Sequence, residues 1–298
     1  MKAGGIGKIL LYRFLFCAII ELNERGDAMI KLIAIDMDGT LLNHDKKIPA
    51  DNILAIRRAA EAGIKVVICT GRMQLGVIPY FEQLDFAGHD EYAILNNGCS
   101  VHHTSDWSLQ SYSELSHEDV AFLAKASANY PGVYLTFADQ KGYTVLEDKV
   151  PDIVAYDAGL VFTEAKPVTL ETVFDHEPIF QAMYLGEKEE LDLFQAEQGV
   201  KLSETFSTVR SQTYIFEAMP AGVTKASALA KLAEELGFSP DEVMAIGDAD
   251  NDLEMLAFAG VSVAMGNASD KVKAMAKFET ASCDQAGVAR AIEDHALL

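Results

Sequence analysis

A short apolar run that ends in two aspartates constrains this sequence more than any other feature. Residues 32–35, Leu-Ile-Ala-Ile, are followed at once by Asp36, Met37, Asp38 and Gly39. A run that lacks a polar face and ends beside a glycine is typical of a strand buried on both faces of a parallel sheet. Ligands in such sheets bind at the carboxyl ends of the strands. The two carboxylates therefore either cap a turn or belong to a ligand site, and only residues elsewhere in the sequence distinguish these two interpretations.

Two further segments repeat the pattern of a buried strand that ends in small polar residues. A helix predicted from residue 48 closes at Gly63, and the strand after it ends in Thr70-Gly71-Arg72. A third short strand, at 92–95, leads into Asn96-Asn97-Gly98. Strands that alternate with helices in this way predict an α/β fold with a doubly wound parallel sheet.

Residues 111–212 interrupt this alternation. The strands predicted there, at 133–137 and 180–185, are more polar and alternate more than those before them. We interpret this segment as an inserted α+β module. Residues 29–110 and 213–298 are then the two parts of one core domain.

Residues 1–28 do not resemble the rest of the chain. Their apolar run, at 9–20, is interrupted by Arg13, has no small-x-small cleavage site after it and is too short to span a bilayer. We expect translation to start at Met29, with residues 1–28 as an extension outside the fold. A secretory signal is the alternative.

The charge balance and the cysteines exclude some classes of function. The chain has 24 Lys and Arg against 45 Asp and Glu, a formal net charge of −21, and shows no basic patch, so we expect no nucleic-acid partner. An acidic protein that handles an anionic substrate needs local compensation from a metal ion and a few placed cations. The four cysteines have neither a metal-ligand nor a disulfide spacing, which favours a reducing, cytoplasmic setting. Because the apolar run at 9–20 is too short to span a bilayer, we expect no membrane partner.

Four separate places put polar groups at the carboxyl edge of the predicted sheet. They are Asp36 with Asp38, Thr70, Lys225 at a helix start, and the acidic loop at 248–252. Carboxylates so close together repel one another unless they share a hard divalent ion, and oxygen-only ligands favour Mg²⁺. One amine and one hydroxyl beside such a site suit a phosphate group. The residues thus predict Mg²⁺-dependent phosphoryl transfer, with one carboxylate free to act as nucleophile.

In this order and spacing, the residues resemble the four motifs of the haloacid dehalogenase (HAD) superfamily. The matching segments are Asp36-Met37-Asp38-Gly39-Thr40, Thr70-Gly71-Arg72, Lys225 and Gly247-Asp248-x-x-Asn251-Asp252. The insertion resembles the α/β cap of the Cof-type subfamily, and within that subfamily the chain resembles a sugar-phosphate phosphatase. The resemblance runs from Met29 to the C-terminus and implies a Rossmann-like core with an inserted cap.

The resemblance implies a role for each acidic position. Asp36 resembles the nucleophile that becomes an aspartyl phosphate, and Asp38 resembles the general acid that protonates the leaving oxygen and then activates water. A proton on Asp38 in the first step requires a raised pKa, which a neighbouring carboxylate can supply. Asp248 resembles the Mg²⁺ ligand that completes a site with Asp36 and the backbone carbonyl of Asp38. Asp252 resembles a supporting carboxylate.

The same resemblance implies how phosphate and substrate are held. The phosphate-holding groups are the Thr70 hydroxyl, the Lys225 amine and the backbone N–H of Gly71. Asn251 resembles a phosphate or substrate contact, and Asn97 lies in what resembles a substrate-side loop. Arg72 either helps to bind phosphate or pairs with an acidic neighbour.

The function that these residues favour is a Mg²⁺-dependent phosphatase of a small phosphorylated metabolite, with a sugar phosphate as the favoured class. A phosphomutase of the same superfamily is the alternative among enzymes. A non-catalytic phosphate-binding or signalling protein is the alternative of another class. The single sequence leaves the substrate and the oligomeric state open, a homo-oligomer included, because fold and motif specify chemistry more than substrate.

Overall fold

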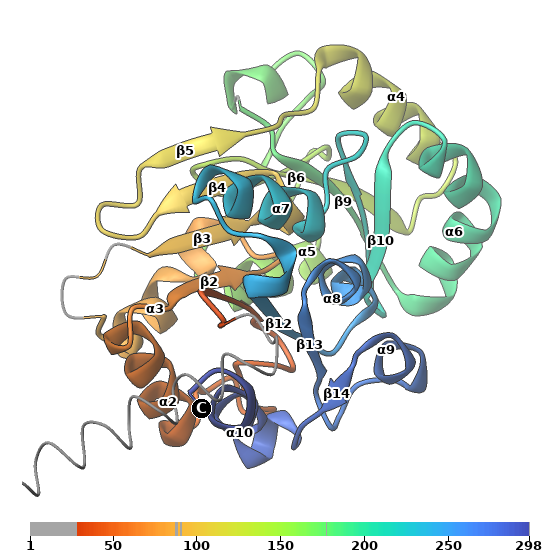
Figure 1. Ribbon diagram of the computed structural model, residues 1–298. Helices are drawn as coiled ribbons and strands as arrows, with labels where there is room; N and C mark the ends of the chain where they lie inside the picture. Colours follow the sequence, from red (N-terminus) through yellow and green to blue (C-terminus); the bar gives the residue numbers. More distant parts are fainter. Residues whose placement is uncertain (1–28, 87–88, 90, 177, 298) are drawn as a thin grey trace, which may run out of the picture.

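The computed structural model describes residues 29–86, 89, 91–176 and 178–297, and the predicted N-terminal extension lies outside them. The described residues form two sheets, each covered by its own helices (Figure 1). The larger sheet belongs to the core domain, and the smaller one belongs to the segment inserted between its two halves.

The core sheet has eight strands in the order β14-β13-β12-β1-β2-β3-β4-β5. Its parallel strands are β1 (Leu32–Asp36), β2 (Lys65–Cys69), β3 (Tyr92–Leu95), β12 (Val243–Gly247), β13 (Val261–Ala264) and β14 (Phe278–Glu279). β1 is buried along its whole length between β2 and β12. The carboxyl ends of these three strands therefore meet at one edge of the sheet.

Alternate side chains of β1 point to opposite faces of the core sheet, and helices cover both faces. Ile33 and Ile35 belong to an apolar cluster with α2 (Ala50–Glu61), α3 (Ile78–Leu84) and α10 (Gly287–His295). Leu32 and Ala34 belong to a second cluster with α7 (Lys225–Glu235), α8 (Leu253–Phe258) and α9 (Asp270–Met275). A strand covered on both sides has to be apolar on both sides, which is why β1 lacks a polar face. The predicted doubly wound α/β fold is confirmed.

Three strands that the sequence pattern did not predict complete the core sheet: the two-residue edge strand β14 and two antiparallel strands at the opposite side. β4 (Ser100–His103) pairs antiparallel with β3, and β5 (Leu109–Tyr112) pairs antiparallel with β4. Both are short, and each mixes polar with apolar residues. Strands of this kind at the edge of a sheet do not stand out from loops by hydrophobic pattern alone.

The cap sheet has six strands in the order β10-β11-β9-β6-β7-β8. They are β6 (Val133–Ala138), β7 (Tyr143–Val145), β8 (Ala165–Pro167), β9 (Gln181–Gly186), β10 (Ser207–Gln212) and β11 (Ile215–Met219). All pairs are antiparallel except β7 with β8, so the sheet is mixed. One face carries α4 (His117–Ser127) and α6 (Lys188–Ser203); the other packs with α5 (Asp152–Leu160) and with Met73 of the core.

The inserted segment extends further than the expected boundary at residue 212. β11 pairs with β9 on one side and with β10 on the other, so the residues up to Met219 belong to the cap sheet. β10 and β11 form a hairpin with only residues 213–214 between them, and the chain returns to the core after the second strand. The boundary on the entry side is close to the expected one, because β5 keeps residues up to Tyr112 in the core sheet.

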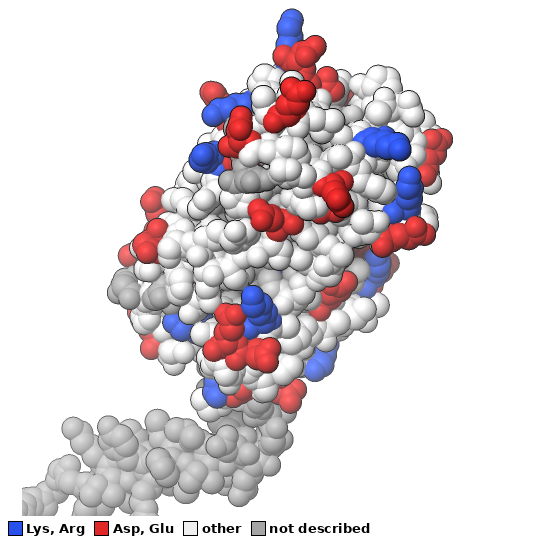
Figure 2. Space-filling view, turned by 90° about the horizontal axis from the view of Figure 1, so that it is seen from above, with Lys and Arg blue, Asp and Glu red and all other residues white. Residues whose placement is uncertain are grey.

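Acidic and basic side chains are intermixed on one face of the molecule (Figure 2). On the face seen in Figure 2, basic side chains lie singly or beside acidic ones and do not gather into a patch. No helix among the described residues is long and apolar enough to cross a membrane. Of the four cysteines, Cys69, Cys99 and Cys283 lie in the described part and are free and buried.

Candidate active site

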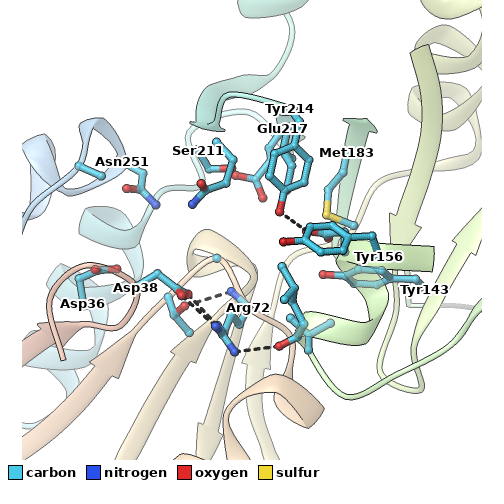
Figure 3. A pocket seen from close by; sticks show the side chains of 18 of the residues that line it. Asp36, Asp38, Arg72, Tyr143, Tyr156, Met183, Ser211, Tyr214, Glu217 and Asn251 are labelled. Atoms are coloured by element: carbon cyan, nitrogen blue, oxygen red, sulfur yellow. Dashed lines mark hydrogen bonds and ion pairs between the residues drawn. The ribbon is translucent and has the colours of Figure 1, made fainter. Parts of the chain in front are cut away.

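A cavity of about 280 Å³ lies between the carboxyl edge of the core sheet and the cap (Figure 3). From the core, its lining includes Asp36, Asp38, Thr70, Gly71, Arg72 and Asn251. From the cap, it includes Tyr143, Tyr156, Asp157, Met183, Tyr214 and Glu217. Pockets for drug-sized ligands span roughly 300–1,000 Å³, so this volume suits a small metabolite.

Asp36, the last residue of β1, shares a buried cation with Asp252. The Lys225 ammonium Nζ lies 2.6 Å from Asp36 Oδ1 and 2.8 Å from Asp252 Oδ1. The other oxygen of Asp36, Oδ2, is buried and has no hydrogen-bond partner among the described residues. Burial, and then repulsion from Asp252, raises the pKa of Asp36 well above its usual value, although Lys225 acts in the opposite direction. One oxygen of Asp36 is thus held and the other is available to a ligand.

The position of Lys225 depends on how its helix begins. Thr224 caps α7, and its hydroxyl accepts the N–H of Ser227 at 3.2 Å. Gly98 packs against this start with φ of +103°, and a Cβ there would lie 2.2 Å from the carbonyl oxygen of Thr224. Lys225 is 1% exposed, and the two carboxylates raise its pKa despite its burial. The ammonium therefore stays charged at the centre of the site.

Asp252 has partners for both of its oxygens. Oδ1 accepts from Lys225, and Oδ2 accepts the backbone N–H groups of Asp248 at 3.0 Å and Ala249 at 3.1 Å. A Cβ at Gly247 would lie 2.6 Å from Asp252, so only glycine allows this close approach. A carboxylate with this set of bonds positions the loop after β12 and is poorly placed to bind an ion as well.

Asp248 approaches β1 from the neighbouring strand. Its Oδ1 accepts from the Thr40 hydroxyl at 3.1 Å, and its Oδ2 accepts from the Asn267 amide at 3.1 Å. A Cβ at Gly39, where φ is +82°, would lie 2.3 Å from Asp248 Oδ2. Burial and then Asp252 raise the pKa of Asp248 to about 6. The glycine after the two aspartates thus makes room for a third carboxylate.

Three carboxylates at these strand ends could hold a metal ion by their spacing. One ligand oxygen each from Asp36, Asp248 and Asp252 lies within 4.8 Å of the others. Asp252 binds the Lys225 ammonium through one oxygen and two backbone N–H groups through the other, whereas each oxygen of Asp248 has one neutral donor. The free oxygen of Asp36 and the carboxylate of Asp248 are therefore the side-chain groups that fit a cation best. The donor set contains only oxygen, which suits a hard divalent ion.

The environment of Asp38 differs from the one expected. Arg72 binds it through two bonds, Nε to Oδ2 at 2.6 Å and Nη2 to Oδ1 at 2.8 Å, and Lys46 Nζ lies 2.6 Å from Oδ1. Burial alone would raise its pKa, but Arg72 and then Lys46 outweigh that effect and lower it to about 2. The expectation of a pKa raised by a neighbouring carboxylate was wrong for this arrangement, because the nearest charges are cations. Of the two alternatives for Arg72, pairing with an acidic neighbour is confirmed.

Arg72 also connects the core to the cap. Its Nη1 donates to the carbonyl oxygen of Gly76 in the core and to that of Leu160 in the cap, each at 3.2 Å. Figure 3 shows the guanidinium between Asp38 and the cap side of the cavity. The same side chain therefore holds Asp38 and touches the element that covers it.

Thr70, Gly71 and Asn251 line the cavity, whereas Asn97 lies behind its wall. Asn97 accepts from the Asn251 amide at 3.1 Å and donates to Gln181 of the cap at 3.4 Å. Gln181 in turn donates to the carbonyl oxygen of Gly71 at 3.2 Å. Asn97 thus orients neighbours that line the cavity, and a direct substrate contact by Asn97 stays a prediction.

Sequence reasoning missed several residues of the site. Lys46 and Asn267 stand in polar loops where nothing distinguishes them from solvated residues. Thr40 stood inside the first motif but was given no role of its own. Glu217 offered a signal, because it is the one charged residue in the apolar strand Ile215–Met219. Asp157 offered none, since acidic residues are common on helices.

Comparison with known families agrees with this geometry. The family described as haloacid dehalogenase-like hydrolase matches residues 33–292, which include the whole cap and nearly all of the core. The chain belongs to this family. This HAD-like hydrolase therefore has the fold and the motif order that its sequence predicted.

Named relatives and solved structures are similar over almost the whole chain. The 5-amino-6-(5-phospho-D-ribitylamino)uracil phosphatases YcsE and YwtE of Bacillus subtilis (strain 168) are 34% and 33% identical to it. The matches cover 90% and 89% of the HAD-like hydrolase and 97% of each relative. A crystal structure of a haloacid dehalogenase-like hydrolase from Bacteroides thetaiotaomicron is 30% identical, with a TM-score of 0.79, over 89% of this chain and 99% of that one.

These relatives are named as phosphatases, and the HAD-like hydrolase is a phosphoric monoester hydrolase as they are. That result decides against the alternative of a non-catalytic binding or signalling protein. It does not by itself assign a role to each residue.

Proposed function

We propose that this HAD-like hydrolase is a Mg²⁺-dependent phosphatase that transfers the phosphoryl group of a small sugar phosphate to Asp36 and then to water. The observation that carries the proposal is the state of the Asp36 carboxylate. One oxygen is held by the buried Lys225, and the other is buried without a partner at the edge of a cavity. An unpartnered buried carboxylate oxygen is costly, and a ligand that binds there removes the cost.

The residues present fit a magnesium ion. Asp36 and Asp248 would hold it through their carboxylates, together with the backbone carbonyl of Asp38. Burial, and then the neighbouring Asp252, raises the pKa of both carboxyl groups, and a divalent cation beside them would favour their ionised forms. When bound, the ion would neutralise negative charge on the phosphoryl oxygens and so ease the approach of an anionic nucleophile.

In the first step, a carboxylate oxygen of Asp36 attacks phosphorus and the bond from phosphorus to the leaving oxygen breaks. Asp38 gives its proton to that oxygen, so the product leaves as an alcohol. The Thr70 hydroxyl, the Gly71 N–H and the Lys225 ammonium are the donors available to the phosphoryl oxygens. In the second step, water attacks the phosphoryl group, Asp38 accepts the proton from water, and the bond to Asp36 breaks.

The first step requires a proton on Asp38, which the arrangement without substrate does not favour. A phosphate dianion in the cavity brings negative charge close to Asp38 and competes with it for Arg72 and Lys46. Both effects raise the pKa of Asp38 above the value of about 2 that the two cations give it. The substrate itself thus supports the acid form that its cleavage needs.

The substrate class rests on the cavity and on the relatives. A volume of about 280 Å³ accommodates a small metabolite. Two relatives at 33–34% identity are named for a phosphorylated ribityl compound, which carries several hydroxyl groups beside its phosphate. A sugar phosphate has the same combination of one phosphate and several hydroxyls.

The test is phosphate release from p-nitrophenyl phosphate and from a panel of sugar phosphates, with Mg²⁺ and with excess EDTA. Wild-type protein should release phosphate only with Mg²⁺, and Asp36→Asn should release none while keeping its thermal unfolding transition. Turnover that survives in Asp36→Asn would overturn the assignment of the nucleophile. An isomerised sugar phosphate without free phosphate would indicate the phosphomutase instead.

A further inference from the structure

Two acidic side chains of the cap line the cavity opposite the residues proposed for phosphoryl transfer. Glu217 lies on β11 and Asp157 on α5. Phe216 and Ala218, the neighbours of Glu217, pack in the apolar interior of the cap. Since side chains alternate along a strand, Glu217 points to the other face, toward the core domain. Figure 3 shows Glu217 beside Tyr214, across the cavity from Asp38.

Glu217 is buried without a counter-charge. It is 3% exposed, and its Oε2 has no hydrogen-bond partner among the described residues. No ion pair with Lys, Arg or His reaches it in the described part of the chain. Burial raises its pKa to about 7, although Ser211 and Asn97 act in the opposite direction. Ser211 and Asn97 bond to this carboxyl group, but its Oε2 stays without a partner among the described residues, so a donor from a bound molecule fits there.

Asp157 adds a second acceptor to the same wall. It is 6% exposed, and its Oδ1 accepts from the Tyr214 hydroxyl at 3.0 Å. Burial raises its pKa to about 6. Tyr143, Tyr156 and Met183 add largely apolar surface to this side of the cavity, and Ser211 and Gln212 add polar groups. The cap wall, defined as Asp157, Tyr214 and Glu217, therefore offers acceptors and negative charge to whatever is attached to the phosphate.

Such a wall discriminates by charge. A hydroxyl or ammonium group can donate to Glu217 or Asp157 and thereby remove the cost of their burial. A carboxylate or a second phosphate would lie against two acidic groups in a cavity where repulsion is weakly screened. Hydrogen-bonding sites of this kind reject ligands that leave their buried polar groups unpaired.

We propose that Glu217 and Asp157 are specificity-determining residues that select leaving groups rich in hydrogen-bond donors and exclude leaving groups with a second anionic group. The inference rests on the proposed function, because it concerns the leaving group of the same phosphoryl transfer. It adds a rule for substrate choice: one phosphate, several donors and no further negative charge.

The test compares two substrates that differ by one phosphate. With purified full-length protein and Mg²⁺, kcat/KM is measured for fructose 6-phosphate and for fructose 1,6-bisphosphate. Wild type should prefer the monophosphate by about tenfold or more, mainly through KM. Glu217→Gln and Asp157→Asn should each lower this preference several-fold, about threefold to tenfold. Glu197→Gln, the same change on the cap outside the cavity, should keep the wild-type preference.

Each outcome bears on one of the two proposals. Equal kcat/KM for the two substrates in wild type, or a preference that neither variant changes, overturns the role of Glu217 and Asp157. Hydrolysis of p-nitrophenyl phosphate, whose leaving group has no added charge or donors, tests the proposed function separately. If that hydrolysis needs Mg²⁺ and Asp36 while the preference is absent, only the inference fails. Should Glu217→Gln lose its cooperative unfolding, Asp157→Asn alone decides.

Discussion

The two walls of the cavity differ in whether their buried carboxyl groups are paired with cations of the protein. The core wall is defined as Asp36, Asp38, Lys225, Asp248 and Asp252. On it, Asp36 and Asp252 share the Lys225 ammonium at 2.6 and 2.8 Å, and Asp38 pairs with Arg72 at 2.6 Å. On the cap wall, Glu217 and Asp157 have no ion pair among the described residues. On the core wall, Asp36, Asp38 and Asp252 are therefore each paired with a cation of the protein, whereas the two acidic groups of the cap wall have no ion pair of their own among the described residues.

Asp38 and Glu217 illustrate the difference, because their pKa values are shifted in opposite directions. Arg72 and Lys46 lower the pKa of Asp38 to about 2, while burial raises the pKa of Glu217 to about 7. Ion pairs fix the catalytic carboxylates of the core wall in place, which suits a phosphoryl transfer that is the same for every substrate. Unpaired buried acceptors suit recognition, since the cost of their burial is removed only by a ligand with donors.

The strongest test of the core wall is Asp36→Asn. Because the nucleophile is lost while shape and size are kept, kcat should fall by at least about 10³-fold. Phosphate release measures the loss, and thermal unfolding confirms that the variant is folded. A fall of less than tenfold would place the nucleophile elsewhere.

Removal of the Lys225 ammonium should lower both the activity and the stability of the enzyme. Lys225→Met leaves Asp36 and Asp252 buried without compensation, so we expect a loss of about 3–5 kcal/mol in the free energy of unfolding. Denaturant unfolding at neutral pH measures it. The double variant Lys225→Met/Asp252→Asn should recover part of the stability and none of the activity. Equal stability of wild type and Lys225→Met would contradict the pairing.

The metal proposal predicts a graded effect at Asp248. Asp248→Asn should raise the Mg²⁺ concentration needed for half-maximal activity by about 10–100-fold, because a carboxylate ligand is replaced by a neutral amide. A Mg²⁺ titration of phosphate release measures it. The matched control is Asp250→Asn in the same loop, since Asp250 pairs with Lys271 at 2.7 Å away from the cavity. An equal shift in both variants would remove Asp248 from the metal site.

For the cap wall, the pKa of Glu217 predicts how stability depends on pH. Its folded value of about 7 lies above its ordinary value of 4.5, so the folded state binds more protons between these values. The free energy of unfolding therefore falls as pH rises from 4.5 through 7, by up to about 3 kcal/mol from this group. Glu217→Gln stays neutral, so its stability relative to wild type should increase across that range.

Urea unfolding of wild type and Glu217→Gln between pH 4.5 and 8 measures that difference, with Glu197→Gln as the control. A difference that does not change with pH would show that Glu217 is not a strained acid in the free protein. The cap wall would then resemble the core wall in having its charges balanced.

The smallest effect is expected at Lys46, the outer partner of Asp38. Its side chain is 46% exposed, so solvent screens the pair, and Lys46→Ala should change stability by less than about 1 kcal/mol. Its kcat/KM should fall by only about threefold to tenfold, since Arg72 remains on Asp38. Steady-state kinetics beside Arg72→Ala, for which a larger fall is expected, ranks the two cations. The reverse order would assign the main electrostatic role to Lys46.

The residues of the core wall could be predicted from the sequence because they stand at the ends of regular elements. A buried parallel strand brings its last residues to the same edge as its neighbours, so Asp36, Thr70 and Asp248 converge whatever the loops do. Lys225 could be predicted for the same reason, because it stands at the start of a helix. The family resemblance implied the role of each residue, and the spacing of the motifs predicted that they meet at one edge of the sheet.

Other features could not be predicted, because they depend on contacts between distant segments. Lys46 and Asn267 reach the site through loop conformation, which single residues do not reveal. The low pKa of Asp38 depends on Arg72 adopting one of two arrangements that the sequence left open. The end of the inserted segment at Met219 depends on the pairing of β11 with β9 and β10.

The sequence by itself thus determined the core fold, the order of the motifs and the reaction class, because alternating strands and helices encode them locally. The tertiary structure decided which charges are balanced and which are not. It paired Lys225 with two carboxylates 189 and 27 residues away, and through the register of one cap strand it turned Glu217 toward the cavity. Charge balance is a property of neighbours in space, and only the folded chain determines which neighbours those are.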